Sequence, residues 1–296
     1  MKFFLAAVFA GSLLAAPADI VDAKIKAKIA GFNGHVSLYA KNLETGATFN
    51  LEGDAPVRTA STIKFPIMIE CFAEAAEGNL DLAESIKLTE EEKVSGSGIL
   101  QDLSSGKEYR IHDLIMLMIT LSDNTATNVI LNRIGGNAVN TRMAKLGLEQ
   151  TRSMRKILGD GNKLKSVPTG ISDEGAKPEN KKWGIGRSSP HEMVTLLEKV
   201  HRGELVNKTA SGEMLDILKK QRDHSGIARD LKDVVVANKS GALDALRSDV
   251  GIAFSKQGPI AMAITIDGMP TPDWSPDNPG ELLISAISEI LIDSLR

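Results

Sequence analysis

The chain has 296 residues, of which 42% are hydrophobic and 25% charged, and its formal net charge at pH 7 is -3. This composition is that of an ordinary globular protein. No basic tract or aromatic-interleaved patch favours a nucleic-acid partner, and no segment beyond the N-terminal region is apolar enough to span a membrane.

Residues 1–18 carry one positive charge, a nearly continuous apolar run and then small residues. This is the anatomy of a secretory signal peptide, with cleavage after Ala18. An uncleaved anchor is disfavoured because the apolar run is shorter than the roughly 20 residues needed to cross a bilayer. We expect an exported bacterial protein, periplasmic or secreted, without a membrane anchor. The roughly 280 residues that remain suit two domains or one large one.

Both ends of the mature chain carry sheet and helix signals. Residues 19–33 suit an amphipathic helix ending at Gly31, and alternating residues at 35–40 and 47–51 flank a Gly-containing turn, which predicts a hairpin. Strand signals return at 234–239, 249–254 and 260–266, and residues 281–295 form an apolar-rich helix. Between Lys64 and about Leu197 the pattern is mainly helical, with long loops.

This order predicts an α+β fold: an antiparallel sheet flanked by N- and C-terminal helices, with an all-helical domain inserted. The expected boundaries are 1–18 for the signal peptide, 19–63 with 198–296 for the sheet domain, and 64–197 for the helical domain. A cleft between two such domains is a favoured place for a small-molecule site.

The stretch from Thr59 to Pro66 lies where these domains would meet. Ser61 and Lys64 are three residues apart at the start of an apolar helix, so they share a face. A neutral lysine can take the proton of an adjacent serine and so activate it as a nucleophile. The helix N-terminus favours the oxyanion that forms when a carbonyl is attacked.

Other nucleophile candidates are weaker. Ser104–Lys107 and Ser153–Lys156 repeat the Ser-x-x-Lys spacing but open no buried helix, and we interpret them as solvated loop residues. Cys71, the only cysteine, has no base evidently beside it and is interpreted as a small buried hydrophobe.

Two further polar turns lie downstream. Ser122-Asp123-Asn124 follows a long apolar helix; alone it is explained as a helix cap, yet the Ser122 hydroxyl could pass a proton and the Asn124 amide could hold a substrate carbonyl or Lys64. Lys239-Ser240-Gly241-Ala242 ends the strand signal beginning at Val234, and alone it is explained as a polar turn. Its cation and hydroxyl could bind a carboxylate, and the Ala242 N–H could be a second oxyanion donor beside that of Ser61.

Together these three motifs resemble the serine β-lactamase and penicillin-binding protein superfamily, and most closely class A β-lactamases. Residues 95–100, 122–128 and 134–136 are also similar to that family, so the resemblance covers essentially the whole mature chain. It implies an exported monomeric serine hydrolase, without metal or cofactor, that acts on a β-lactam or a peptidoglycan-like peptide. Three motifs in the family's order are far more specific than any one.

The resemblance also implies individual roles. Ser61 would become acylated, with Lys64 as base; burial and the charge of Lys239 would lower the pKa of Lys64. Ser122 would carry the proton to the ring nitrogen and Asn124 would orient the substrate. The substrate carboxylate would lie against Lys239 and Ser240, with Gly241 and Ala242 beside it. Arg247 could add positive potential there.

One departure concerns the glutamate that class A enzymes use to activate the deacylating water. Its expected place falls near Arg155–Leu158, where the chain has no carboxylate. The loop then runs unusually far, to Arg187. It contains four acidic residues that could replace the base or could equally be solvated charges: Asp160, Asp173, Glu174 and Glu179.

Two alternative functions follow from this departure. One is a D,D-peptidase or esterase-like hydrolase of the same fold, and the other is a sensor that binds β-lactams or cell-wall peptides without turnover. Other chemistries lack support, because the chain has no Gly-x-Ser-x-Gly elbow, no His-Glu-x-x-His helix and no phosphate loop, and its histidines lack metal-ligand spacing.

Overall fold

The computed structural model describes residues 17–159 and 172–296. Residues 1–16 of the predicted signal peptide therefore lie outside the described residues, and so does Asp160. The α-helices are α1 (Pro17–Ile29), α2 (Lys64–Ala76), α3 (Ile111–Thr120), α4 (Asn124–Ile134), α5 (Gly136–Lys145), α6 (Asp173–Ala176), α7 (Pro190–Arg202), α8 (Lys208–Leu218) and α9 (Pro279–Ser294). Short 3₁₀ helices are η1 (Ala60–Ile63), η2 (Leu100–Asp102) and η3 (Pro178–Trp183).

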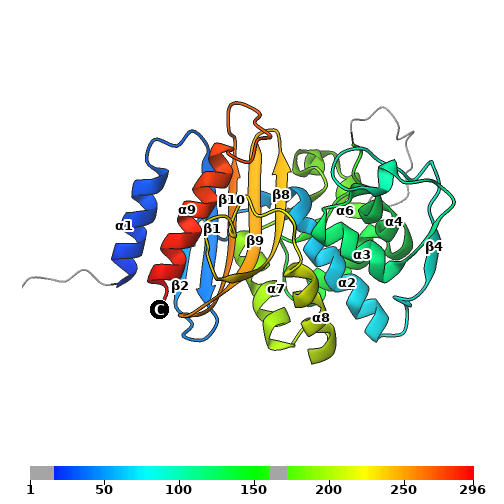
Figure 1. Cartoon of the computed structure of the whole chain (residues 1–296), viewed down its shortest axis with the longest axis horizontal. Coiled ribbons are helices and arrows are strands. Elements are labelled where there is room, and N and C mark those ends of the chain that lie inside the picture. Colours follow the sequence, from blue (N-terminus) through cyan, green and yellow to red (C-terminus); the bar gives the residue numbers. More distant parts are fainter. Residues whose placement is uncertain (1–16, 160–171) are drawn as a thin grey trace, which may run out of the picture.

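A five-stranded antiparallel sheet forms the centre of the molecule (Figure 1). Its strands are β1 (His35–Asn42), β2 (Thr48–Leu51), β8 (Val235–Leu243), β9 (Leu246–Ser255) and β10 (Gly258–Asp267), in the order β2-β1-β10-β9-β8. The predicted hairpin is β1 with β2. The three strands predicted near the C-terminus are β8, β9 and β10.

The sheet separates two apolar cores, because successive strand residues face opposite sides. In β10, Ile260, Met262, Ile264 and Ile266 belong to the core shared with α1 and α9. The intervening Ala261 and Ala263 belong to the core on the helical side. Figure 1 shows α1 and α9 on one side of the sheet and α2 to α8 on the other, which confirms the predicted α+β fold.

Helix α2 lies at the centre of the helical side. Every residue from Lys64 to Ala73 is buried, so the helix is surrounded by protein over nearly three turns. Cys71 is 0% exposed, as predicted, and burial raises the pKa of its thiol, which keeps it in the inert protonated form. The carboxylate of Glu70 is paired with Arg142 of α5 at 2.7 Å, which fixes α5 against α2.

The middle of the chain is less purely helical than its pattern predicted. Short strands β3 (Val57–Arg58), β7 (Gly186–Ser188) and β6 (Arg152–Ser153) form one small sheet, and β4 (Ser85–Lys87) pairs with β5 (Glu108–Arg110). Two- and three-residue strands are too short for alternation to reveal them. The predicted boundary at 197/198 falls inside α7, and the division into two domains stays a prediction.

One buried carboxyl group on α9 makes stability depend on pH. Glu281 is 7% exposed, and burial, reinforced by the negative charges of Asp249 and Asp223, raises its pKa from 4.5 to about 8. Between pH 4.5 and about 8 the folded protein therefore keeps the Glu281 proton, whereas the unfolded chain has released it. The resulting stabilisation is complete below pH 4.5 and is lost as the pH rises to about 8.

We expect Glu281→Gln, whose amide resembles the protonated acid, to reduce this loss. Between pH 5 and pH 8 the wild type should lose about 2 to 4 kcal/mol more unfolding free energy than the variant, because each shifted pKa unit is worth about 1.4 kcal/mol. Urea unfolding at the two pH values measures this. Glu289→Gln, an exposed position on the same helix, is the control. Parallel pH profiles for wild type and Glu281→Gln would contradict the assignment.

Candidate active site

The three predicted motifs meet at one cleft of about 610 Å³. Six of the predicted site residues line it: Ser61, Ser122, Asn124, Ser240, Gly241 and Ala242. The two predicted lysines, Lys64 and Lys239, are each 0% exposed and lie in the protein beneath it. All eight residues named from the sequence are therefore at or directly below one surface.

Ser61 lies in η1, immediately before α2 begins. The edge strand β8 comes unusually close to this turn, because Gly241 has no side chain. A Cβ atom at Gly241 would be 2.8 Å from the Thr59 carbonyl oxygen and 3.0 Å from the Ser61 nitrogen. Any other residue would push β8 away from η1, so Gly241 sets the spacing between Ser61 and Ala242 across the cleft.

Two lining residues have backbone conformations that side-chain-bearing residues rarely adopt. Ala60 has φ 46° and Ser122 has φ 53°. Such backbone conformations persist mainly where the surrounding structure enforces them, and they cluster at functional sites. One of these residues precedes Ser61 and the other begins the Ser-Asp-Asn turn, which is consistent with a functional role for the cleft.

Lys64 connects α2 to the Ser-Asp-Asn turn. Its Nζ donates to Ser122 O at 2.7 Å, Ser122 Oγ at 3.1 Å and Asn124 Oδ1 at 2.9 Å. Burial, aided by the charge of Lys239, lowers its pKa well below 10.5, although Asp123 opposes the shift. These hydrogen bonds go to the turn rather than to Ser61. The neutral amine has two protons for these three acceptors, and it has a lone pair that can accept a proton.

The turn is also a helix cap, as its residue types predicted. Asp123 Oδ1 accepts from Ala126 N at 2.8 Å at the start of α4. Its other oxygen accepts from the backbone nitrogens of Ile99 and Leu100. Asn124 adds a link in the opposite direction, donating to Ser95 O at 3.1 Å. The cap thus holds Ser122 and Asn124 against both Lys64 and the loop around residue 95.

On the opposite wall, the Lys239 motif lies within a strand rather than ending it. Strand β8 stays paired through Leu243, and β8 is an edge of the sheet as predicted. Lys239 Nζ donates to Ser240 O at 2.6 Å. Burial lowers its pKa to about 8, against the opposing charges of Asp223 and Asp249. At neutral pH Lys239 is therefore still largely protonated.

The structure adds one residue that no sequence motif indicated. Asp223 lines the cleft and accepts a hydrogen bond from Ser240 Oγ at 2.7 Å. Hydrogen bonds from Ser240 and Ser225, with the charge of Lys239, outweigh burial and hold the pKa of Asp223 below 3.8. Arg247 does not line the cleft: it is buried, and its guanidinium donates to the carbonyl oxygens of Leu243 and Leu246.

The loop expected to supply a deacylation base contributes an arginine, two apolar residues and a glycine to the cleft lining: Arg155, Ile157, Leu158 and Gly159. Asn128 anchors this stretch through hydrogen bonds of 2.9 Å to both the nitrogen and the oxygen of Ile157. None of the three candidate acids in the described part of the loop, Asp173, Glu174 and Glu179, lines the cleft.

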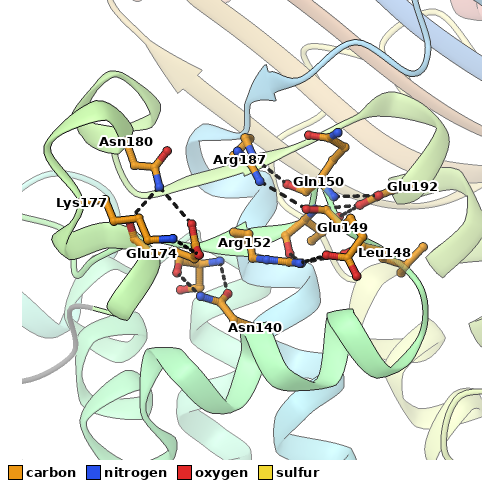
Figure 2. Close-up of polar contacts among 12 residues, drawn as sticks. Asn140, Leu148, Glu149, Gln150, Arg152, Glu174, Lys177, Asn180, Arg187 and Glu192 are labelled. Atoms are coloured by element: carbon orange, nitrogen blue, oxygen red, sulfur yellow. Dashed lines mark hydrogen bonds and ion pairs between the residues drawn. The ribbon is translucent and has the colours of Figure 1, made fainter.

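Figure 2 shows that Glu174 is committed elsewhere. Its carboxylate accepts from Lys177 at 2.6 Å and from Asn180 at 3.1 Å. Asp173 and Glu179 are exposed. At the base of the loop, Arg152 bonds to Leu148 O at 2.7 Å and pairs with Glu149 at 2.5 Å. The ends of the loop are thus fixed by polar contacts outside the cleft.

The two other Ser-x-x-Lys pairs do not line the cleft. Ser104 and Lys107 are exposed, as predicted for loop residues. The prediction that Ser153 and Lys156 are solvated is wrong, since both are buried; Ser153 lies in β6, which pairs with β7. Trp274 lines the cleft and stacks with Arg247, whose Cζ is 4.9 Å from the ring centre.

Residues 17–159 and 172–296 contain no group of three or more His, Cys, Asp or Glu residues placed to hold a metal ion. No helix within those ranges combines the length and apolarity needed to cross a bilayer.

Comparison with known proteins gives consistent matches. The sequence model of the Beta-lactamase enzyme family matches residues 20–295. Beta-lactamase AER-1 of Aeromonas hydrophila is 23% identical over 74% of this chain and 67% of its own length. Beta-lactamase VEB-1 of Pseudomonas aeruginosa is 22% identical over 82% of this chain and 80% of its own.

The solved structures that resemble this chain include a beta-lactamase and PBP-A. A beta-lactamase from Sphaerobacter thermophilus is 28% identical, with a TM-score of 0.76, over 91% of this chain and 94% of that one. PBP-A is 26% identical, with a TM-score of 0.78, over 93% and 95%. A leucine-to-glutamate mutant of PBP-A, solved as an acyl-enzyme complex with penicillin G, is 27% identical with a TM-score of 0.77, over 93% and 95%.

Proposed function

The chain belongs to the Beta-lactamase enzyme family and is a β-lactamase-like serine hydrolase, and we propose that it is exported and opens β-lactam amides through an acyl-enzyme on Ser61. The observation that carries this proposal is the buried Lys64, whose pKa is lowered and whose amine reaches the Ser122 hydroxyl on the cleft wall opposite β8. In this proposal Ser61 is the nucleophile, Ser122 the proton carrier and Lys64 the base, held beneath the cleft that the two serines line.

The proposed reaction uses these groups in turn. Neutral Lys64 takes the proton of the Ser61 hydroxyl, and Oγ attacks the lactam carbonyl carbon. The N–H groups of Ser61 and Ala242 stabilise the oxyanion. When the C–N bond breaks, Ser122 delivers a proton to the ring nitrogen and regains one from Lys64. The product is an ester between Ser61 and the opened substrate.

For hydrolysis of that ester, the described cleft lining offers no evident general base on the loop. The loop stretch from Arg155 to Gly159 that lines the cleft has no carboxylate to activate water. This observation favours a second candidate function, in which a β-lactam acylates the protein and the ester is hydrolysed only slowly. A penicillin-binding sensor or a D,D-peptidase would behave in this way. We propose β-lactam acylation in either case, and the rate of deacylation separates the two.

Stopped-flow hydrolysis of a chromogenic cephalosporin, followed far beyond one enzyme equivalent, tests the proposal. We expect a burst of one equivalent, followed by turnover at least about a hundredfold slower, because a positioned general base is worth about 10²–10⁴ in rate. Intact-protein mass spectrometry should then find the adduct on Ser61. Ser61→Gly should show neither burst nor adduct, and an adduct persisting in that variant would overturn the mechanism.

A further inference from the structure

An exposed tryptophan lies at the rim of the cleft, on the loop between β10 and α9. Trp274 is one of the lining residues, yet 64% of its surface is exposed. Exposure alone carries little weight, because single apolar side chains are common on protein surfaces. What distinguishes Trp274 is that the surrounding protein holds it in place.

One buried guanidinium holds both the ring and the backbone at this position. Arg247 is only 2% exposed, and its Cζ lies 4.9 Å from the centre of the Trp274 ring. The same side chain donates a hydrogen bond to Asp273 O, the carbonyl that precedes the tryptophan. Its Nη1 donates to Leu243 O and Leu246 O at 2.7 Å each, which ties the guanidinium to the β8–β9 turn. The indole therefore rests on a cation that is itself fixed.

The loop that carries Trp274 has further anchors. Asn278 donates to Asp273 O at 2.7 Å, and Arg229 donates to Pro276 O at 2.5 Å. A side chain that is already fixed loses little conformational entropy when a ligand binds, so more of the contact free energy appears as affinity. An indole adds a large, rigid surface with only two rotatable bonds. These properties suit a contact surface for a ligand.

The position of Trp274 along β8 indicates which part of a substrate it would meet. In the proposed binding mode, the substrate carboxylate lies at the Lys239 end of the strand and the Ala242 N–H holds the carbonyl oxygen. Arg247 is paired with Ala242 in the ladder, and its guanidinium reaches Leu243 O, beyond Ala242. The ring on that guanidinium therefore lies near the far end of the strand, where Leu243 also lines the cleft. A substrate lying along β8 would direct its acyl substituent towards this end.

The indole offers this substituent a flat apolar surface. The guanidinium covers one side of the ring, and the exposed remainder is open to a partner. Aromatic rings that stack attract one another by more than their buried area accounts for. An alkyl group of similar size would gain the burial without the stacking.

We propose that Trp274 is a specificity-determining residue, whose exposed surface stacks on a planar aromatic ring in the acyl substituent of the substrate. This inference rests on the proposed acyl-enzyme at Ser61. It narrows the substrate class of the same site to β-lactams whose acyl group carries an aryl ring.

Three acyl derivatives of 6-aminopenicillanic acid test it: phenylacetyl, cyclohexylacetyl and acetyl. They share the lactam and the carboxylate and differ only in the acyl group. The first carries a planar ring, the second a saturated ring of similar size, and the third no ring. Acylation of Ser61, followed by intact-protein mass spectrometry, gives a second-order rate constant for each compound.

We expect the phenylacetyl-to-acetyl ratio of these rate constants to fall about tenfold in Trp274→Ala, through loss of burial and stacking together. Trp274→Phe keeps an aromatic ring and should retain most of the ratio. The cyclohexylacetyl-to-acetyl ratio should fall only about threefold in Trp274→Ala, because the saturated ring loses burial alone.

Comparing ratios between proteins cancels the intrinsic reactivity of each compound. The control is Leu282→Ala, which removes an exposed apolar side chain of α9 that does not line the cleft and should leave both ratios unchanged. A phenylacetyl-to-acetyl ratio that is the same in Trp274→Ala as in wild type, or equal falls of the two ratios, would overturn this inference alone. Failure of all three compounds to acylate Ser61 would overturn the proposed function and the inference with it.

Discussion

Lys64→Met should slow acylation of Ser61 by about a thousandfold, within the roughly 10²–10⁴ that a general base contributes. Methionine fills a similar volume but has no basic nitrogen, so the Ser61 proton loses its acceptor. The wild-type rate should rise with pH through the lowered pKa of Lys64, since only the neutral amine can act as base. That acid limb should vanish in the variant, as single-turnover kinetics across pH would show.

The control addresses folding, because methionine leaves Ser122 O and Asn124 Oδ1 without their donor. Thermal unfolding should show that the variant still folds, at a cost of about 1–3 kcal/mol for the unpaired acceptors. Lys64→Arg offers a second comparison, since arginine retains hydrogen-bond donors but stays protonated at these pH values and so cannot accept the Ser61 proton. An acylation rate near that of wild type in either variant would mean that another group removes the Ser61 proton.

The sequence predicted the cleft because its chemistry is concentrated in short motifs. Ser61 with Lys64, and Ser122 with Asn124, are each fixed by local helix geometry, so spacing along the chain carries their arrangement. The central sheet was predictable for a similar reason, since β1 alternates apolar and polar residues and β10 is a short apolar run, as in a strand buried on both faces. The short strands β3 to β7 were not, because they depend on distant pairing partners.

Asp223 and Glu281 show what local patterns leave out. Asp223 lies among polar residues between α8 and β8, and nothing near it indicates that its partner is Ser240, 17 residues away. Glu281 stands at the start of an amphipathic helix, where an acidic residue is ordinarily an exposed partner of the helix dipole. Its burial follows from the packing of α9 on the sheet. Both properties come from tertiary structure, which periodicity does not encode.

Loop position 158 offers a direct test of whether deacylation is slow for want of a carboxylate in the cleft. Leu158 lines the cleft yet is 49% exposed, so a polar side chain there incurs little desolvation cost. The preceding residue is held by Asn128 through both backbone groups, which fixes where the side chain at 158 begins. A carboxylate at this position would lie on the cleft wall formed by the loop, where it can polarise a water.

Leu158→Glu should therefore convert a burst of one equivalent into sustained hydrolysis of the chromogenic cephalosporin, raising deacylation by about 10²–10⁴ while leaving acylation nearly unchanged. The matched control is Leu158→Gln, which has almost the same shape but cannot accept a proton from water. If the glutamine variant turns over as fast as the glutamate variant, the gain comes from a displaced loop and not from a base. If the wild type already turns over steadily and Leu158→Glu adds nothing, deacylation does not depend on a carboxylate at this wall of the cleft.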